Sequence, residues 1–160
     1  MSATLIRALA CACLLVSANA CRFKEKAPEG IPMAQLIQQG RSPVEISGLQ
    51  RSIGPMPSFS MTLANLSDRK VDSVRWTVLL FKSDGKLLAD GQAEGGYGEF
   101  PGIAPGASVQ GLFAAGSDKA ATARLVVREV VYTDKVMDME IAKKWTNPKH
   151  DAEVKTALGK

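Results

Sequence analysis

Between residues 43 and 134, apolar and polar positions alternate with a period of two, which is typical of strands that bury one face. In the segment 58–64, every second residue is apolar and the others are small or polar. The segment 71–82 repeats this pattern around a tryptophan, and we expect Trp76 to be the central buried aromatic residue of the core. The inward-facing positions of the two segments are Phe59, Met61, Leu63, Val74, Trp76, Val78 and Leu80.

Turn signals separate these segments, about 8 to 12 residues apart. Asp84 and Gly85 predict a hairpin turn, because both residue types adopt the required backbone conformations at low cost. Pro105 followed by Gly106 predicts a type II turn. The sequence therefore predicts about seven short strands, joined by turns.

Two further patterns concern individual strands. The stretch 91–106 contains six glycines and two prolines, which favours an edge strand and loops over a central strand. Within the β-branched run 125–132, the adjacent polar residues Arg128 and Glu129 shift the apolar frame and predict a β-bulge. Together the patterns predict an all-β fold, an immunoglobulin-like antiparallel β-sandwich in residues 43–134.

Helices are expected on both sides of the sandwich. Three apolar residues recur every four positions after residue 134, which predicts a helix that packs one face on the sandwich. Asp151 is placed to cap a second, short helix, so residues 135–160 form a helical C-terminal extension in this interpretation. A short helix is also predicted at 33–39, ended by Gly40. The three recurring residues are Met137, Ile141 and Trp145.

Residues 1–20 have the three parts of a secretory signal peptide. A short basic region ends at Arg7, an apolar stretch covers 8–16, and small residues precede a cleavage site after Ala20. The apolar stretch is well short of the roughly 20 residues that span a bilayer, so we expect export rather than a permanent transmembrane helix. Cleavage would leave a mature chain that begins at Cys21.

Cys21 is the candidate site with the most specific signal. Cys11 and Cys13 leave with the leader, so Cys21 is the only cysteine of the predicted mature chain and has no internal partner for a disulfide. The residues before it, with Cys21 itself, resemble the lipobox of bacterial lipoproteins, in which the cysteine is acylated. The same residues also satisfy the rule of ordinary signal peptidase, so a soluble periplasmic or secreted protein is the alternative.

Residues 21–42 are rich in charged residues, proline and glycine, which predicts an N-terminal tether between a membrane and the sandwich. The charge balance gives no sign of a nucleic-acid partner. The chain carries 20 Lys and Arg against 16 Asp and Glu, and the basic residues are dispersed. Lysines near the C-terminus are interpreted as a solvated helix face, with contact to anionic lipid or envelope polymers as the alternative. They are Lys143, Lys144, Lys149, Lys155 and Lys160.

A series of short motifs in residues 58–133 prompts a family resemblance. In order they are Leu63-Ala64-Asn65-Leu66-Ser67, Val74-Arg75-Trp76-Thr77-Val78-Leu79-Leu80-Phe81, Asp84-Gly85-Lys86-Leu87-Leu88 and Ala104-Pro105-Gly106-Ala107-Ser108. This order resembles the small bacterial immunoglobulin-like domains of the FxLYD type, with Lys82 where their signature has Asp. The resemblance implies an exported protein or lipoprotein whose domain is a binding or structural module, and it brings no catalytic residue.

The sequence contains few candidates for catalytic or metal-binding residues. The only histidine, His150, lies in a tail flanked by Pro and Lys, so we expect no Ser-His-Asp triad and interpret His150 as a solvated residue. One histidine and one cysteine cannot provide the usual ligands of zinc. Four acidic residues near the turns lack the spacing of a calcium loop, and we expect no metal and no cofactor. They are Asp84, Asp90, Glu94 and Glu99.

These observations favour a lipid-anchored, non-enzymatic protein of the bacterial cell envelope. We expect it to bind another envelope protein, or to help assemble a complex, through a sheet edge or the glycine-rich loop around Tyr97. Tyr97 itself is interpreted first as a ring that covers one end of the sandwich. The alternative is a soluble periplasmic carrier of a small ligand or polymer. An enzyme that uses an acidic pair such as Asp90 and Glu94 is a third hypothesis.

Overall fold

A computed structural model of the chain describes residues 30–52, 57–98 and 102–160. The predicted leader, Cys21 and Glu99 lie outside the described residues. The elements in chain order are α1 (Met33–Gln38), β1 (Val44–Arg51), β2 (Ser58–Asn65), β3 (Lys70–Phe81), β4 (Leu87–Tyr97), β5 (Ser108–Ala114), β6 (Thr122–Val136), β7 (Met139–Thr146) and α2 (His150–Ala157).

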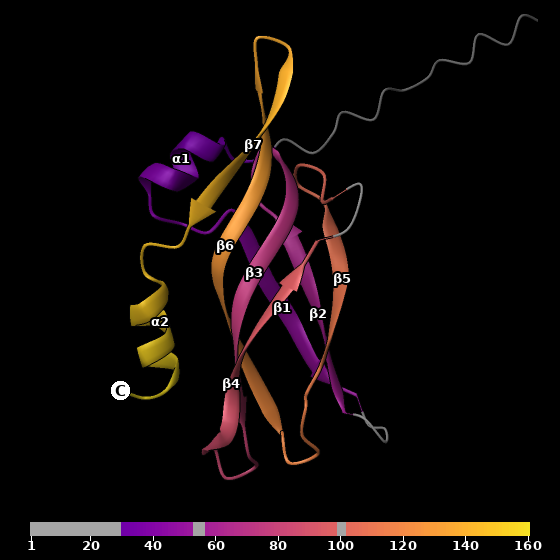
Figure 1. Cartoon of the computed structure of the whole chain (residues 1–160), viewed down its shortest axis with the longest axis vertical. Helices are drawn as coiled ribbons and strands as arrows, with labels where there is room; N and C mark the ends of the chain where they lie inside the picture. Colours follow the sequence, from indigo (N-terminus) through magenta and orange to yellow (C-terminus); the bar gives the residue numbers. More distant parts are fainter. Residues whose placement is uncertain (1–29, 53–56, 99–101) are drawn as a thin grey trace, which may run out of the picture.

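The strands form two antiparallel sheets that pack face to face (Figure 1). One sheet has the strand order β1-β2-β5, and the other has the order β4-β3-β6-β7. The all-β sandwich predicted from the alternation is therefore confirmed. Constant-type immunoglobulin domains pair the fourth strand with the first sheet, whereas here β4 pairs with β3 in the second sheet. The strands β4 and β5 are edges of different sheets, and the edge position of β4 is the one that the glycine-rich stretch 91–106 predicts.

The core between the sheets contains the residues that the alternation selects. Phe59, Met61 and Leu63 of β2 are buried, and Trp76 of β3 has only 2% of its surface exposed. Phe59 stacks on Phe113 of β5 with ring centroids 5.4 Å apart, which joins neighbouring strands of the smaller sheet. Trp76 extends the core from the larger sheet, so its prediction as the central buried aromatic residue is confirmed.

The predicted β-bulge and turns are also present. Arg75 lies opposite Glu129 while the next residue, Trp76, lies opposite Val127, so Arg128 is the extra residue of β6. Gly85 has a φ of 79° in the β3–β4 hairpin, and Gly106 has a φ of 66° in the turn before β5. Positive φ is the conformation that glycine adopts without steric cost.

The helix predicted around residues 137–145 is wrong, because this segment is strand β7, which pairs with β6 as a hairpin. Residues spaced by four share a face in a helix and also in a strand, where the period is two. Ile141 and Trp145 are compatible with both structures, and Met137 is part of the turn. Lys143 and Lys144 therefore lie on a strand rather than on the face of a helix.

The N-terminal tether is wrong for residues 30–42, which pack on the sandwich. Ile31 donates its N–H to the carbonyl of Leu66 at 2.7 Å. The predicted short helix is present as α1, in which Met33 and Leu36 are buried, and it is followed by Gly40 with a φ of 59°. Any tether is confined to residues 21–29, outside the described residues.

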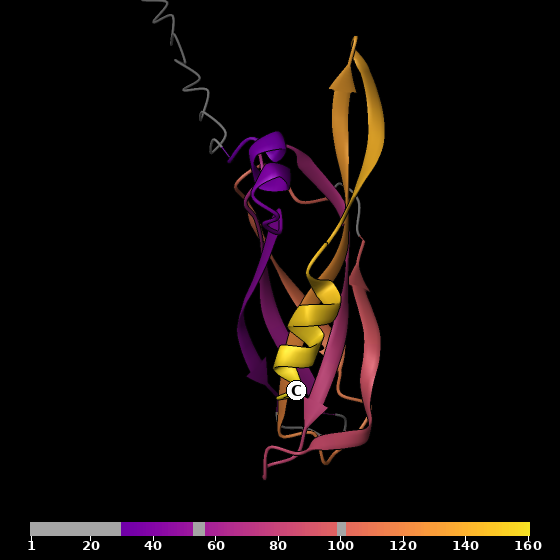
Figure 2. The same ribbon diagram turned by 90° about the vertical axis from the view of Figure 1, so that its left-hand side faces the viewer.

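The C-terminal helix α2 lies along the larger sheet (Figure 2). It begins after Lys149, so Asp151 lies in the first turn and is not the cap. Thr77, Leu79 and Phe81 alternate with the core residues of β3 and are buried as well, which indicates that the outer face of this sheet is covered. Of the helical extension predicted for residues 135–160, only the short second helix is present, because residues 139–146 form a strand.

Candidate functional site

Two adjoining hollows lie where β4 and β5 face each other across the two sheets. Their volumes are about 480 Å³ and about 380 Å³, and their lining residues are neighbours along both strands. We call them together the β4–β5 cleft. Such volumes lie within the range of pockets that hold small molecules.

One half of the β4–β5 cleft surrounds Trp76. Gly95 lies opposite Trp76 in the β3–β4 ladder, and a Cβ atom at Gly95 would be 2.4 Å from the indole Nε1. That Nε1–H is buried and has no hydrogen-bond acceptor among the described residues. Tyr97 and Gln110 line the same half, so an aromatic ring and an amide lie beside the buried indole. A ligand that brought an acceptor to Nε1 would satisfy a buried donor.

The other half of the cleft has an apolar floor and a charged rim. Leu80, Leu88 and Phe113 contribute the apolar surface. The charged residues of the rim carry both signs, which gives it no net preference for an anion or a cation. They are Lys82, Asp90, Glu94 and Lys119.

The acidic residues that the sequence marks as candidates do not form one site. Asp84 makes an ion pair with Lys86 at 3.5 Å in the β3–β4 turn, whereas Glu94 on β4 makes an ion pair with Arg128 on β6. Within residues 30–52, 57–98 and 102–160, no group of three or more potential metal ligands comes together. Tyr97 is half-buried and packs against the core, as expected for a ring that covers one end of the sandwich.

The prediction that His150 is a solvated tail residue is wrong. Only 17% of its side chain is exposed, and its Nε2 lies 2.9 Å from the Thr77 hydroxyl. Its Nδ1 lies 3.0 Å from an Asp151 carboxylate oxygen. The hydroxyl, imidazole and carboxylate follow the order of a catalytic triad, but Thr77 is only 3% exposed and lies under α2, where a substrate would have to displace the helix. We interpret these contacts as the attachment of α2 to the sheet.

Asn147 attaches the start of the same helix and is a residue that the sequence patterns did not single out. Its Nδ2 donates to the Val127 carbonyl at 2.8 Å and to Glu153 at 2.9 Å, and its Oδ1 accepts the N–H of Lys149. At the other end of α2, Arg124 donates to the Ala157 carbonyl at 2.8 Å. An asparagine that accepts the N–H two residues on forms an Asx turn, and asparagine is a turn signal that the sequence does contain.

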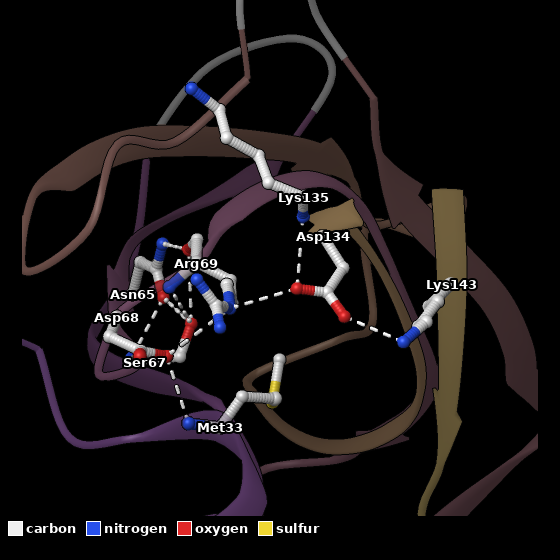
Figure 3. A network of polar contacts seen from close by, with 8 residues as sticks. All are labelled: Met33, Asn65, Ser67, Asp68, Arg69, Asp134, Lys135 and Lys143. Carbon is white, nitrogen blue, oxygen red and sulfur yellow. Dashed lines mark hydrogen bonds and ion pairs between the residues drawn. The ribbon is translucent and has the colours of Figure 1, made fainter. Parts of the chain in front are cut away.

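A polar network fixes the end of the sandwich where α1 lies (Figure 3). Asn65 is buried, and its amide donates to the carbonyls of Arg69 and Ile103 at 2.7 and 2.9 Å. Asp68 accepts the N–H of Met33 at 2.9 Å, at the start of α1. The network therefore joins α1 to the β2–β3 turn.

The same network continues to the β6–β7 hairpin. Arg69 Nε is 3.2 Å from one carboxylate oxygen of Asp134, and the other accepts a hydrogen bond from Lys143 at 2.6 Å (Figure 3). These contacts hold the pKa of Asp134 below its ordinary value, mainly through the Lys143 hydrogen bond. The hairpin is thus braced at the level where it leaves the sandwich.

Cys21, the candidate with the most specific sequence signal, lies outside the described residues. None of the helices within the described part of the chain combines the length and apolarity needed to cross a bilayer.

Comparison with known proteins finds similar solved structures. No family model matches the chain, and no relative is found among curated proteins. A hypothetical protein from Peptoclostridium difficile 630 is similar with a TM-score of 0.55 and 16% identity, over 75% of this chain and 93% of that chain. This likeness shows the fold alone. A DUF1425 family member from Shewanella sp. pv-4 matches with a TM-score of 0.42 and 14% identity, over 53% of this chain and 76% of that chain.

Proposed function

We propose that this protein is a lipid-anchored component of a bacterial cell envelope and acts as a non-enzymatic binding or assembly module. The proposed anchor is an acylated Cys21, which would otherwise be an unpaired thiol in an exported protein. The proposed domain type is the FxLYD type, on the motifs shared with that family. The leader before Cys21 and the sandwich that follows support this assignment.

The observation that carries the binding role is the unprotected edge of β5. Natural sheet edges are usually blocked by charges, bulges or proline. The edge strands β1 and β7 carry charged residues, β1 also has a bulge, and β4 carries Asp90 and Glu94. β5 contains neither a charged residue nor a proline, and its Leu112 is 71% exposed. An extended segment of a partner could add to β5 through main-chain hydrogen bonds.

A soluble periplasmic carrier is the second candidate, and the buried Nε1–H of Trp76 favours it. A buried donor without an acceptor costs about 1 to 3 kcal/mol, which a bound carbonyl or hydroxyl group would recover. The test is native mass spectrometry of the purified protein. A ligand retained by the wild type and lost from Trp76→Phe, which keeps a ring but removes the donor, would favour the carrier.

The anchor is tested by the mass of the mature N-terminus after expression of the full-length chain in a bacterial host. We expect a diacylated or triacylated Cys21 in the membrane fraction, and a Cys21→Ser variant that leaves that fraction. An unmodified Cys21 in the soluble periplasmic fraction would reject the anchor and favour the carrier.

The binding edge is tested by a photo-crosslinking residue at Leu112, with a matched probe at Glu45 on the exposed edge of β1. We expect crosslinks to an envelope protein from position 112 and none from position 45. Leu112→Lys places a charge on the edge and should abolish the crosslink from a second probe at Gln110. Equal crosslinking from both edges would argue against β5 as the binding edge.

A further inference from the structure

Large apolar side chains are exposed mainly at one end of the molecule. Six such residues occur among the described residues, and four of them belong to the β6–β7 hairpin. A fifth, Ile37, lies in α1, which Figure 1 shows at the same end. We call the four hairpin residues the hairpin tip, namely Val136, Met137, Met139 and Ile141. Grouped exposure of this kind marks an interaction surface, whereas single exposed apolar residues do not.

The hairpin tip extends beyond the sandwich. Thr133 is the last residue of β6 that pairs with β3, whereas Met139 of β7 pairs with Val136 further along. The four residue-to-residue steps from Thr133 to Met137 correspond to about 13 Å of strand, and Figure 1 shows the hairpin projecting from the rest of the fold. Val136, Met139 and Ile141 share one face of this projection, because paired residues and residues two apart lie on the same side.

The turn of the hairpin places a methionine in a conformation that methionine does not favour. Met137 and Asp138 have φ values of 50° and 65°, as in a two-residue type I′ turn. Asn, Asp and Gly are the usual residues there, because a left-handed conformation costs most other L-residues about 1 to 2 kcal/mol. Met137 is also 90% exposed, so it gains no burial in return. Folding alone does not account for a methionine at this position.

We propose that the hairpin tip inserts into the interfacial region of a lipid bilayer, so that the protein meets the membrane at two points. This proposal rests on the proposed function for the first point, the lipid at Cys21. The nine peptide steps from Cys21 to Gly30 reach at most about 30 Å, which exceeds the roughly 13 Å that the hairpin projects. Because Ile31 is hydrogen-bonded to the β2–β3 turn, the chain joins the fold at the same end as the β6–β7 hairpin. A lipid at Cys21 therefore keeps this end near the bilayer.

The polar network at the base of the hairpin suits this role, because an inserted tip needs a rigid support. Arg69 and Lys143 both contact Asp134, which ties the base of the hairpin to the sandwich and the two strands to each other. The charges of the hairpin balance, with three lysines against three acidic residues, so attraction to anionic lipid adds little. The contact is apolar, and we expect it to depend weakly on salt. The charged residues are Asp134, Lys135, Asp138, Glu140, Lys143 and Lys144.

The test uses the full-length chain with Cys11→Ser, Cys13→Ser and Cys21→Ser, so that no lipid anchor contributes, no other thiol takes the label and the result is independent of acylation. Met137→Cys is labelled with an environment-sensitive fluorophore, and Asp84→Cys in the β3–β4 turn is the matched control. Both proteins are titrated with phosphatidylethanolamine/phosphatidylglycerol vesicles to millimolar lipid. We expect a blue shift and quenching by a lipid-borne quencher at position 137, and no change at position 84. A label at 137 that stays as water-exposed as that at 84 would overturn the proposal.

Two substitutions distinguish insertion of the hairpin tip from apolar contact elsewhere on the surface. With the label kept at position 137, Met139→Asp should shift the titration to about tenfold more lipid, because burying one such side chain is worth more than about 1.4 kcal/mol. Leu112→Asp removes a similarly large apolar residue that is also mostly exposed, on β5, and should leave the titration unchanged. A blue shift that appears without lipid as the protein concentration rises would identify a second copy as the partner and would reject the bilayer.

Discussion

Asp134 accepts a hydrogen bond from Lys143 at 2.6 Å, and this pair joins β6 to β7 where the hairpin leaves the sandwich. The Lys143 hydrogen bond lowers the pKa of Asp134, and the positive charges of Lys143 and Arg69 lower it further. The same hydrogen bond raises the pKa of Lys143. The pair is therefore fully charged at neutral pH and is sensitive to acid through Asp134.

A carboxyl group whose pKa is lowered by folding stabilises the fold above its unfolded pKa, and this stability is lost as the pH falls through the folded pKa. We expect the melting temperature of the wild type to decrease below about pH 4. Asp134→Asn should have a lower melting temperature at neutral pH and a smaller decrease in acid. Trp145, buried on β7, reports the transition by fluorescence. Asp90→Asn is the control, and an acid decrease unchanged in Asp134→Asn but reduced in the control would contradict the assignment.

Gly95 leaves the space that the Trp76 indole occupies. A Cβ at Gly95 would be 2.4 Å from Nε1, and an alanine there forces the ring or the strand to move. We expect Gly95→Ala to reduce the free energy of unfolding by about 1 to 3 kcal/mol, measured by urea denaturation. Gly98→Ala is the matched control, because its Cβ would be 3.4 Å from the Ser73 side chain, an ordinary contact. Equal effects of the two substitutions would mean that Trp76 is not tightly packed.

Thr77 fastens α2 through His150. Thr77→Val keeps the shape of the side chain and removes the hydroxyl, so we expect a loss of about 1 kcal/mol and a helix that is cleaved faster by trypsin after Lys155. Thr62→Val is the control, because the Thr62 hydroxyl accepts a hydrogen bond only in an exposed pair with Gln110. Unchanged cleavage in Thr77→Val would show that other contacts hold the helix.

The hairpin turn offers a substitution with opposite effects on stability and on the proposed membrane contact. Met137→Asn with Asp138→Gly provides the residues that a type I′ turn favours, and we expect about 1 kcal/mol of added stability in urea denaturation. The same variant removes an apolar side chain from the hairpin tip, so it should co-sediment less with vesicles. Met139→Asn, outside the turn, should lose vesicle binding without gaining stability. A turn variant with no gain would show that the positive φ values carry little strain.

Short-range patterns predict the parts of the fold in which one face of a strand is apolar. Phe59, Trp76 and their alternating neighbours specify the core, and Arg128 marks the bulge because it interrupts the alternation. The β7 strand resembles a helix in sequence because Ile141 and Trp145 fit both periods. What distinguishes the two structures is the pairing of β7 with β6, a contact that no short segment of sequence contains.

The candidate site is less predictable, because it depends on contacts between distant segments. Trp76 and Tyr97 stand out singly in the sequence, but the cleft forms only where β4 and β5 face each other. The contact between Thr77 and His150 spans 73 residues. One signal is available: Thr77, Leu79 and Phe81 alternate with core residues in a run that is apolar on both faces, which predicts that a further element covers the sheet.

The length of β6 sets a fixed distance within the molecule. Its 15 residues, Thr122–Val136, correspond to about 50 Å, against a typical strand of about 5 to 6 residues. One end of this strand reaches the hairpin tip, and the other pairs with the end of β3 near Lys82, which lines the β4–β5 cleft. If the hairpin tip lies in a bilayer, β6 holds the far mouth of the cleft roughly 50 Å from the lipid headgroups. A partner captured there would be held at a height set by the folded domain rather than by a tether.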